Sequence, residues 1–202
     1  MLHFETLDPG TLRLLKELMA LPLLKDTRLV GGTALALQLG HRNSIDLDLF
    51  GSVPFSSDDL HDALAAGHSL TVIKESASIN IYLIDGVKVD VVNYRYPWIG
   101  EAVPGDGFIL AGIADIAAMK ISAIVGRGTK KDFIDLFFLI RIFPLRTILD
   151  FYMKKFEDAS IFIAMKSLTY FEDAEADPMP TMLEDISWEA VKEAICNAVI
   201  NL

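Results

Sequence analysis

The chain has 202 residues, of which 52% are hydrophobic, and it carries a formal net charge of -10. This length suits one domain, or one domain with a helical appendage, and the apolar content suffices for a packed core. The single cysteine excludes an intrachain disulfide and a multi-cysteine zinc site, while the acidity argues against broad binding of nucleic acid but allows a small basic pocket that grips one RNA end.

No apolar run approaches the roughly 18 residues needed to span a membrane. The most apolar stretch, residues 133–145, is interrupted by Asp135, Arg141 and Pro144. The first ten residues include acids and lack the basic-then-apolar order of a signal peptide. We therefore expect a cytoplasmic protein of bacterial type that does not act on a membrane.

The N-terminal part predicts helices and strands in a mixed order. A helix over 11–19 precedes a short strand over 28–30, which runs into the doublet Gly31-Gly32. Residues 33–39 predict a buried helix rather than a strand, because Ala and Leu are strong helix formers and Gly40 offers a C-terminal stop. The elements expected next are a strand over 44–50, a helix over 56–66 and strands over 70–75, 79–84 and 87–94, the last two joined by the hairpin signal Asp85-Gly86.

After a Pro/Gly-rich loop the pattern becomes helical. Helices are predicted over 113–126 and 130–142, and further helices over 145–168. An acidic linker follows, and Ser187 caps a last amphipathic helix. The sequence therefore predicts an α+β fold, with a small mixed sheet flanked by helices in residues 1–110 and a helical C-terminal region in residues 111–202.

Two carboxylates two residues apart are the main chemical signal. In the predicted strand over 44–50, Ser44, Asp46 and Asp48 share one face because side chains alternate with period 2. Adjacent carboxylates repel unless a cation compensates them. Mg²⁺ is usually held by one or two carboxylates together with substrate phosphates, so the pair predicts a metal site for Mg²⁺ or Mn²⁺.

The glycine turn just upstream predicts a place for those phosphates. A strand, a Gly-rich turn and a helix N-terminus form an anion site, since free backbone N–H groups and the helix dipole face the ligand. Gly31 and Gly32 would let the backbone approach a triphosphate closely, and Thr33 adds a hydroxyl. The alternative is a tight turn with no ligand.

Asp90 supplies a third carboxylate on another strand. Lys88 and Asp90 share one face of the strand over 87–94, so Asp90 would converge with Asp46 and Asp48 if the two strands are neighbours. Three carboxylates and a triphosphate can hold two metal ions about 3.5–4 Å apart, as in phosphoryl transfer. Asp90 would then ligate a metal or act as the base nearest the acceptor. The alternative is an ion pair with Lys88 or another cation.

A lysine embedded among apolar residues is the third element. Lys120 lies on a predicted helix on the same face as Arg127. Its ammonium would bind the nucleotide phosphates or, alternatively, pair with Asp132 or Asp135 of the next helix. Asp135 is the more probable buried structural partner, because apolar residues follow it, and Asp132 is expected nearer to solvent and ligand.

Several other residues are weaker candidates. Ser44 could meet a terminal phosphate or simply make a hydrogen bond at the strand end. Arg42 could contact a phosphate or be a surface arginine. The four histidines show no metal-ligand spacing, and Tyr170, Phe171 and Trp188 are expected to be core side chains rather than base-stacking platforms.

Taken in order, three motifs resemble the AbiEii/AbiGii toxin family. They are Gly31-Gly32-Thr33, then Arg42-x-Ser44-x-Asp46-x-Asp48-x-Phe50, then residues 115–120 with Arg127-Gly128-x-x-Lys131-Asp132-Phe133-x-Asp135-Leu136. Members of this family have the nucleotidyltransferase fold of the polymerase-β type and occur in type IV toxin–antitoxin and abortive-infection systems. The resemblance covers residues 25–140 well, and residues 167–174 also look similar to stand-alone members.

The resemblance implies a nucleotidyltransferase that moves a nucleoside monophosphate from an NTP to a hydroxyl acceptor. It implies that Asp46 and Asp48 bind Mg²⁺ with the triphosphate, that Gly31, Gly32 and Ser44 line the phosphates, and that Lys120 and Asp132 complete the nucleotide pocket. The acceptor would be RNA, such as a tRNA 3′ end, and a separately encoded antitoxin would oppose the protein.

Two departures from the family pattern matter. The first motif is Gly-Gly-Thr where broader nucleotidyltransferases carry Gly-Ser, so a phosphate contact from Thr33 does not follow from the resemblance. Many toxin-type relatives lack the third carboxylate or place it differently, so a catalytic role for Asp90 rests on the strand argument. Transfer to a small molecule or a protein, a non-catalytic nucleotide-binding module, and a purely structural charge network remain alternatives.

Overall fold

The structure is a computed structural model that describes residues 1–53 and 56–202. Contacts between Cα atoms divide the chain into two compact units. The sheet unit comprises Met1–Leu39, Ser44–Tyr96 and Ala102–Ala111, and the helical unit comprises Gly40–Asn43, Pro97–Glu101 and Gly112–Leu202. This division differs from the predicted domains, 1–110 and 111–202, chiefly because two short segments of the first half belong to the helical unit.

The sheet unit is built around a mixed sheet. Within the described residues this sheet has seven strands in the order β3-β4-β5-β2-β1-β7-β6. Its strands are β1 (Thr27–Val30), β2 (Leu47–Gly51), β3 (Leu70–Lys74), β4 (Ile79–Ile84), β5 (Val87–Asn93), β6 (Val103–Pro104) and β7 (Ile109–Leu110). A strand is present at each place predicted along residues 28–94. The two-residue strand β6 lies in the Pro/Gly-rich segment 97–108 that the sequence predicted as a loop, and β7 follows directly after it.

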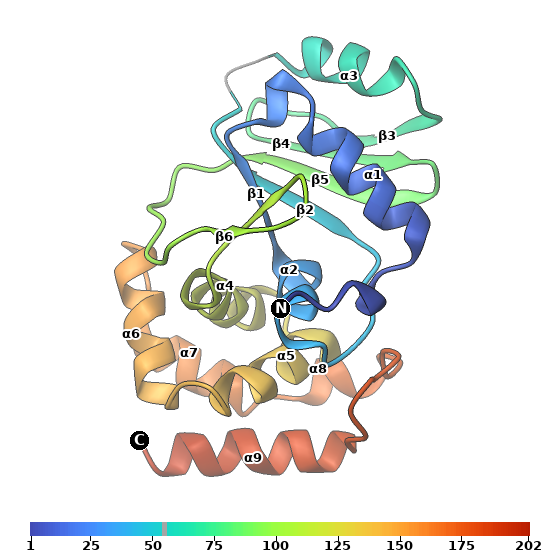
Figure 1. Ribbon diagram of the computed structural model, residues 1–202. Coiled ribbons are helices and arrows are strands. Elements are labelled where there is room, and N and C mark those ends of the chain that lie inside the picture. Colours follow the sequence, from blue (N-terminus) through green and yellow to red (C-terminus); the bar gives the residue numbers. More distant parts are fainter. Residues whose placement is uncertain (54–55) are drawn as a thin grey trace. The chain divides into compact units, whose positions relative to one another are not determined.

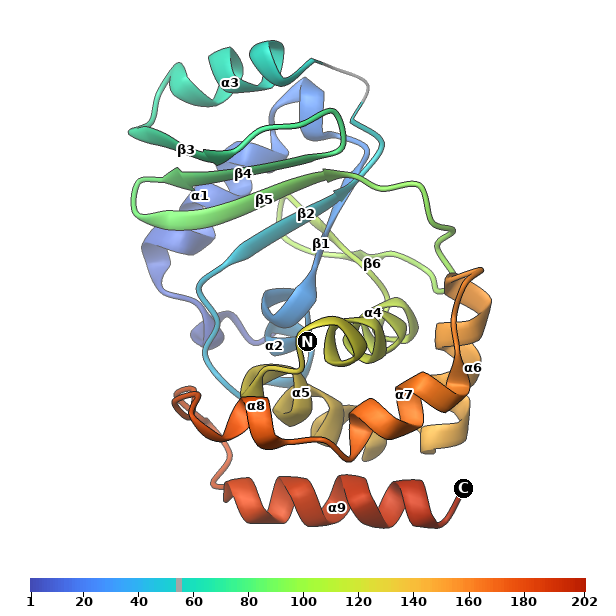
Figure 2. The ribbon, with the colours of Figure 1, turned by 180° about the vertical axis from the view of Figure 1, so that it is seen from behind.

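The three helices that the structure describes in this unit are present where the sequence predicts helices, and two of them begin two residues earlier than predicted. They are α1 (Pro9–Met19), α2 (Gly31–Leu39) and α3 (Ser57–Ala65), with short 3-10 turns at Phe4–Thr6 and Pro22–Leu24. The Asp8 side chain accepts hydrogen bonds from the first backbone N–H groups of α1, and Ser56 forms a capping box with Asp59 at α3. α1 crosses in front of β4 and β5 in Figure 1 and behind them in Figure 2, so it covers one side of these strands.

The alternation of burial along the central strands separates a core face from a polar face. Leu47 and Leu49 of β2 are fully buried, as are Val89 and Val91 of β5, while the residues between them are only half-buried. β2 pairs with β5 in parallel and with β1 antiparallel. The predicted neighbourhood of the two acidic strands is therefore confirmed.

One predicted boundary is wrong in a way that affects the site. The strand expected over 44–50 begins only at Leu47, so Ser44 and Asp46 precede the sheet instead of belonging to it. Ile45 is 63% exposed. Alternation of apolar and polar residues continues upstream of β2, but the backbone there bonds elsewhere: the Ser44 N–H donates to the Thr6 carbonyl at 3.1 Å.

The helical unit confirms the prediction of a helical C-terminal region. Its helices are α4 (Ile113–Gly126), α5 (Lys130–Ile140), α6 (Leu145–Lys155), α7 (Ile161–Leu168), α8 (Glu172–Glu175) and α9 (Trp188–Ile200). The rings of Phe133, Phe171 and Trp188 pack together with centroids 4.9–6.0 Å apart. Two of the three predicted aromatic core residues thus lie in this cluster, whereas Tyr170 is 51% exposed and is not a core residue.

A buried ion pair fixes the segment Pro97–Glu101 within the helical unit. The Lys155 Nζ lies 2.6 Å from Asp115 Oδ1 and 2.8 Å from the Pro97 carbonyl oxygen. The Asp115 carboxylate also accepts hydrogen bonds from the backbone N–H groups of Ile99 and Gly100. Asp115 is wholly buried and Lys155 nearly so. Removing either charge would leave the other buried without compensation.

No helix in the part of the chain that the structure describes is both long and apolar enough to cross a membrane.

Candidate active site

Asp48 and Gly31 meet at the point where β1 passes into α2. Gly31 begins α2 with φ +69°, a conformation that favours glycine. A Cβ added at Gly31 would lie 2.0 Å from Asp48 Oδ2, so a larger residue would collide with the carboxylate. Two features that the sequence placed 17 positions apart are thus in contact. The glycine turn and the Asp48 carboxylate therefore form one structural feature.

Asp90 lies beside Asp48 in the sheet. The two residues are register partners on the parallel strands β2 and β5, and neighbouring strands lie about 4.8 Å apart. Lys88 Nζ lies 2.5 Å from Asp90 Oδ1, and the Asp90 side chain is 19% exposed. Asp48 and Asp90 therefore lie side by side, as predicted. The ion pair of Asp90 with Lys88, predicted as the alternative to a catalytic role, is also present.

Asp46 is held through its backbone. The Thr33 hydroxyl of α2 is hydrogen-bonded to the Asp46 carbonyl oxygen and lies 2.8 Å from Ser44 Oγ. Thr33 itself is 1% exposed, while Ser44 and Asp46 are half-buried. Ser44 therefore contacts Thr33 at the first turn of α2, a turn whose first backbone N–H groups have no partner within a helix.

In the helical unit, Lys120 takes part in a buried cluster of charges. Its Nζ lies 2.9 Å from Asp132 Oδ1 and 2.6 Å from Asp135 Oδ2. Lys120 is 5% exposed and both aspartates are 1% exposed or less. The ion pairs that the sequence offered as the structural alternative are observed. The expectation that Asp132 lies near solvent is wrong, because Arg127 and Thr129 also bond its carboxylate.

Arg42 belongs to the same cluster. Its Nε and Nη2 donate to the Asp135 carboxylate at 2.7 and 2.9 Å, and the His41 ring bonds the same carboxylate at 2.8 Å. Arg42 is 3% exposed. It is therefore not a surface arginine, and its observed partner is a carboxylate of its own unit.

These contacts determine the protonation of the cluster. Burial alone would raise the pKa of Asp132, but Lys120, Arg127 and Thr129 outweigh burial and lower it to about 2. Burial likewise opposes ionisation of Asp135, yet Lys120 and Arg42 hold its pKa well below the usual range. Burial disfavours the charged form of Lys120, and Asp135 and Asp132 reverse this and raise its pKa. The cluster is thus fully ionised at neutral pH.

The donors near Gly31 suit a hard divalent cation. Asp46, Asp48 and Asp90 offer carboxylate oxygens, the ligands that Mg²⁺ and Mn²⁺ prefer. Within residues 1–53 and 56–202, no group of three or more His, Cys, Asp or Glu is arranged to hold a metal ion. A site with two carboxylates that takes its other ligands from substrate phosphates fits this arrangement.

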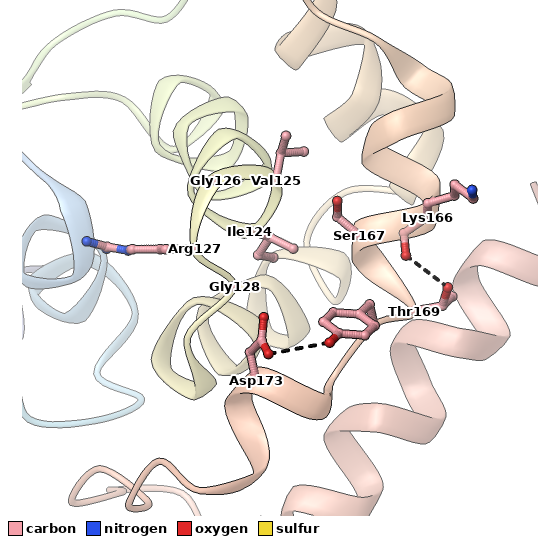
Figure 3. Close-up of a pocket in the computed structure, with 10 residues that line it drawn as sticks. Ile124, Val125, Gly126, Arg127, Gly128, Lys166, Ser167, Thr169 and Asp173 are labelled. Carbon is pink, nitrogen blue, oxygen red and sulfur yellow. Dashed lines mark hydrogen bonds between the residues drawn. The ribbon is translucent and has the colours of Figure 1, made fainter.

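A cavity of about 590 Å³ lies in the helical unit, at the C-terminal ends of α4 and α7. Figure 3 shows that the side chains of Arg127 and Lys166 point away from it, and that Asp173 lies at its edge. Among the described residues that line it there is none of the predicted site residues. The cavity therefore adds no residue to the predicted site.

Comparison with known proteins identifies the family. A family model described as nucleotidyl transferase AbiEii toxin, type IV toxin–antitoxin system, matches residues 13–106. The uncharacterised protein aq_aa25 of Aquifex aeolicus (strain VF5) is 37% identical over 187 residues, covering 89% of this chain and 89% of that protein. The chain belongs to the AbiEii nucleotidyltransferase toxin family. The resemblance stated from the three motifs is confirmed.

Solved structures show the same fold for this AbiEii protein. A candidate nucleotidyltransferase from H. pylori has a TM-score of 0.64 at 19% identity, covering 96% of this chain and 95% of its own. JHP933 from Helicobacter pylori has a TM-score of 0.63 at 21% sequence identity, covering 96% of this chain and 92% of its own. MenT4, a nucleotidyltransferase toxin from Mycobacterium tuberculosis H37Rv, has a TM-score of 0.55 at 16% sequence identity, covering 94% of this chain and 84% of its own. The predicted α+β nucleotidyltransferase fold is confirmed.

Sequence reasoning missed two features of the AbiEii protein. It assigned Gly31 to a triphosphate, whereas the structure shows that Asp48 already requires a glycine there. It also left Arg42 unpaired, although Asp135 in an apolar run signals a buried counter-ion. A partner 93 positions away cannot be chosen from spacing. The predicted nucleotide-binding roles of Arg42, Lys120 and Asp132 stay predictions.

Proposed function

We propose that the protein transfers a nucleoside monophosphate from an NTP to a hydroxyl acceptor and requires Mg²⁺ or Mn²⁺. One observation carries this proposal. The Asp48 carboxylate lies against Gly31 at the start of α2, and Asp90 is its register partner on the next strand. Carboxylates beside a helix N-terminus offer both a cation site and a phosphate site.

Asp46 and Asp48 are the residues that would hold the ion. A divalent cation bound there would neutralise charge on the triphosphate during transfer. Gly31 and Gly32 expose the N-terminal N–H groups of α2 to the phosphates, and the positive end of the helix dipole favours the anion. Ser44 is half-buried at the same turn and would add a hydroxyl contact to the phosphates.

Asp90 is proposed as the group that takes the proton of the acceptor hydroxyl. The acceptor oxygen would form a bond to the α-phosphorus as the bond from this phosphorus to the bridging oxygen breaks. Pyrophosphate then leaves with the bonding electrons, and the hydroxyl proton passes to the Asp90 carboxylate. Lys88 Nζ, 2.5 Å from Asp90 Oδ1, would hold that carboxylate in place.

The family supports a toxin role. The matching model describes a type IV toxin–antitoxin system, and the similar structure MenT4 is described as a nucleotidyltransferase toxin. We propose that the acceptor is the 3′ end of an RNA such as tRNA, and that a separately encoded antitoxin opposes the activity. With a net charge of -10 the protein would grip the RNA locally rather than along its length.

Labelled nucleotides test this function. The protein is incubated with each α-labelled NTP and Mg²⁺ in the presence of separate pools of RNA, protein and small hydroxyl compounds. The proposal expects label in the RNA pool together with release of pyrophosphate. Label in the protein pool or in the small hydroxyl compounds would show that the acceptor is not RNA. Nucleotide binding without pyrophosphate release would contradict catalysis and favour a non-catalytic binding module.

A further inference from the structure

The backbone that leads into β2 needs an anchor outside the sheet. β2 begins at Leu47, so the residue before it has no place in a strand ladder although Asp46 is a proposed metal ligand. Backbone polar groups that leave a ladder are normally satisfied by other partners. For the Asp46 carbonyl, that partner is the Thr33 hydroxyl in the first turn of α2.

The hydroxyl protons of this contact can be assigned from chemistry. A carbonyl oxygen only accepts, so Thr33 donates its single hydroxyl proton to Asp46. Ser44 Oγ lies 2.8 Å from Thr33 Oγ1 and must therefore be the donor of that second bond. The Thr33 proton is thus used inside the protein. Thr33 is also 1% exposed, which leaves little of its side chain to meet a phosphate.

We propose that Thr33 is a positioning residue for the metal carboxylates and not a ligand of the triphosphate. It ties the Asp46 backbone to the same helical turn that begins with Gly31, and Gly31 in turn contacts the Asp48 carboxylate. The phosphate turn and both carboxylates are therefore held as one unit. This inference rests on the proposed function, because it assumes that Asp46 and Asp48 hold the ion.

The proposal accounts for the Gly-Gly-Thr motif. A β-branched side chain in a helix has restricted χ1, which limits the directions in which its hydroxyl can point. Burial of the side chain restricts it further. A threonine here therefore directs one donor at one carbonyl oxygen, and the phosphates are left to the backbone N–H groups of the turn.

Thr27 offers a matched control. It is also 1% exposed, lies in the same unit, and donates its hydroxyl proton to a backbone carbonyl, that of Leu24, at 2.7 Å. Thr33→Val and Thr27→Val each replace a hydroxyl by a methyl group and remove the same kind of hydrogen bond. Only Thr33→Val detaches a proposed metal ligand. Thr33→Ser keeps the hydroxyl and removes the methyl group.

The experiment measures how much Mg²⁺ is needed for nucleotide binding. Non-hydrolysable analogues of ATP, GTP, CTP and UTP are titrated into the full chain at rising Mg²⁺, and unfolding is followed separately. We expect Thr33→Val to raise the half-saturating Mg²⁺ concentration roughly 10–100-fold, the usual effect of losing a residue that orients a metal ligand. Thr33→Ser should stay within about twofold, and Thr27→Val should match the wild type although both valine variants lose similar stability.

The outcomes separate this inference from the proposed function. An unchanged Mg²⁺ requirement in Thr33→Val would overturn the positioning role, as would equal shifts in Thr33→Val and Thr27→Val. If Asp46→Asn/Asp48→Asn also leaves binding unchanged, the proposed function itself has failed. Should Thr33→Val not fold, Thr33→Ser is compared with Thr27→Ser, and a raised Mg²⁺ requirement in Thr33→Ser alone would overturn the role of the hydroxyl.

Discussion

The acidic side chains of the two units are held in opposite ways. In the helical unit, Asp132 and Asp135 are buried and paired with Lys120, and their pKa values lie below the usual range. In the sheet unit, Asp46 and Asp48 are half-buried, and Asp48 contacts a glycine whose conformation few other residues adopt. Buried, neutralised carboxylates stabilise a fold, whereas partly exposed carboxylates beside an anion site can be reached from solvent by a cation.

The strongest way to break this comparison is to remove the exposed pair. Asp46→Asn/Asp48→Asn should lower nucleotidyl transfer by at least about 10³-fold, because metal-assisted charge stabilisation is worth several kcal/mol. Thermal unfolding should show that the variant still folds, because both side chains are only half-buried and asparagine has nearly the same size as aspartate. Steady-state rates and thermal unfolding measure the two effects.

Asp58→Asn/Asp62→Asn is the matched control for that experiment. Asp58 and Asp62 are exposed acids of α3. Each of the two double variants removes two negative charges and so changes the net charge from -10 to -8. The control should keep its activity. Equal losses in both double variants would point to net charge rather than to a metal site.

Lys120→Met breaks the buried cluster. It should destabilise the protein by about 3–5 kcal/mol, because two buried carboxylates lose their shared cation. Lys155→Met removes the cation of the other buried pair and should cost a similar amount. Chemical denaturation measures both.

The same two variants test the predicted nucleotide role of Lys120. Both variants are measured under conditions where they are folded. If Lys120→Met and Lys155→Met bind NTP with equal affinity, the role of Lys120 is structural only. An affinity lost in Lys120→Met but kept in Lys155→Met would instead support the phosphate contact predicted from the sequence.

The role of Asp90 can be tested by comparing variants of Asp90 and of its ion-pair partner Lys88. If Asp90 takes the acceptor proton, Asp90→Asn should lower kcat by about 10²-fold or more. Lys88→Met should lower it much less, because the carboxylate remains. Measured kcat values that fall equally in the two variants would show that the ion pair, not proton transfer, is what matters.

The buried cluster also predicts a dependence of stability on pH. Asp132 and Asp135 have folded-state pKa values below those of an unfolded chain, so their stabilisation is complete above about pH 4 and falls at lower pH; the part due to Asp132 is lost as the pH falls through about 2. Asp132 alone should contribute about 2 kcal/mol, since one pKa unit corresponds to about 1.4 kcal/mol. Urea unfolding at several pH values measures this. In Lys120→Met the loss should begin at higher pH, and an unchanged acid profile would contradict the cluster.

Two glycines give the smallest and most local test. A Cβ at Gly126, the last residue of α4, meets nothing within 4 Å. Gly126→Ala should therefore raise the free energy of unfolding by up to about 1 kcal/mol. Gly31→Ala should lower both stability and activity, because its Cβ would collide with Asp48. Differential scanning fluorimetry ranks the two, and stabilisation by Gly31→Ala would contradict the contact.

Local patterns predicted most of the fold. The helix start at Ser56, the hairpin at Asp85-Gly86 and the alternation in β5 each depend on residues near one another in the sequence. The start of β2 and the strands β6 and β7 could not be predicted, because they depend on which distant backbone lies alongside. β7, for example, pairs with β1 through Leu29 and Leu110.

The candidate site was predictable in its residue types and less so in its contacts. Spacing predicted Asp46, Asp48 and Asp90 as chemistry-bearing residues near a glycine turn, and the register of β2 with β5 places two of them side by side. Spacing could not show that Thr33 bonds the Asp46 carbonyl or that Arg42 bonds Asp135. Such partners are set by tertiary packing, not by local pattern.

Isothermal titration of a non-hydrolysable NTP analogue tests the central claim most directly. With Mg²⁺ present, the wild-type chain should release or absorb heat on binding, and the same titration without Mg²⁺ should show little. Asp46→Asn/Asp48→Asn should lose the Mg²⁺-dependent heat while Asp58→Asn/Asp62→Asn retains it. Identical heats from the wild type and from Asp46→Asn/Asp48→Asn would contradict the assignment of this turn as the metal–nucleotide site.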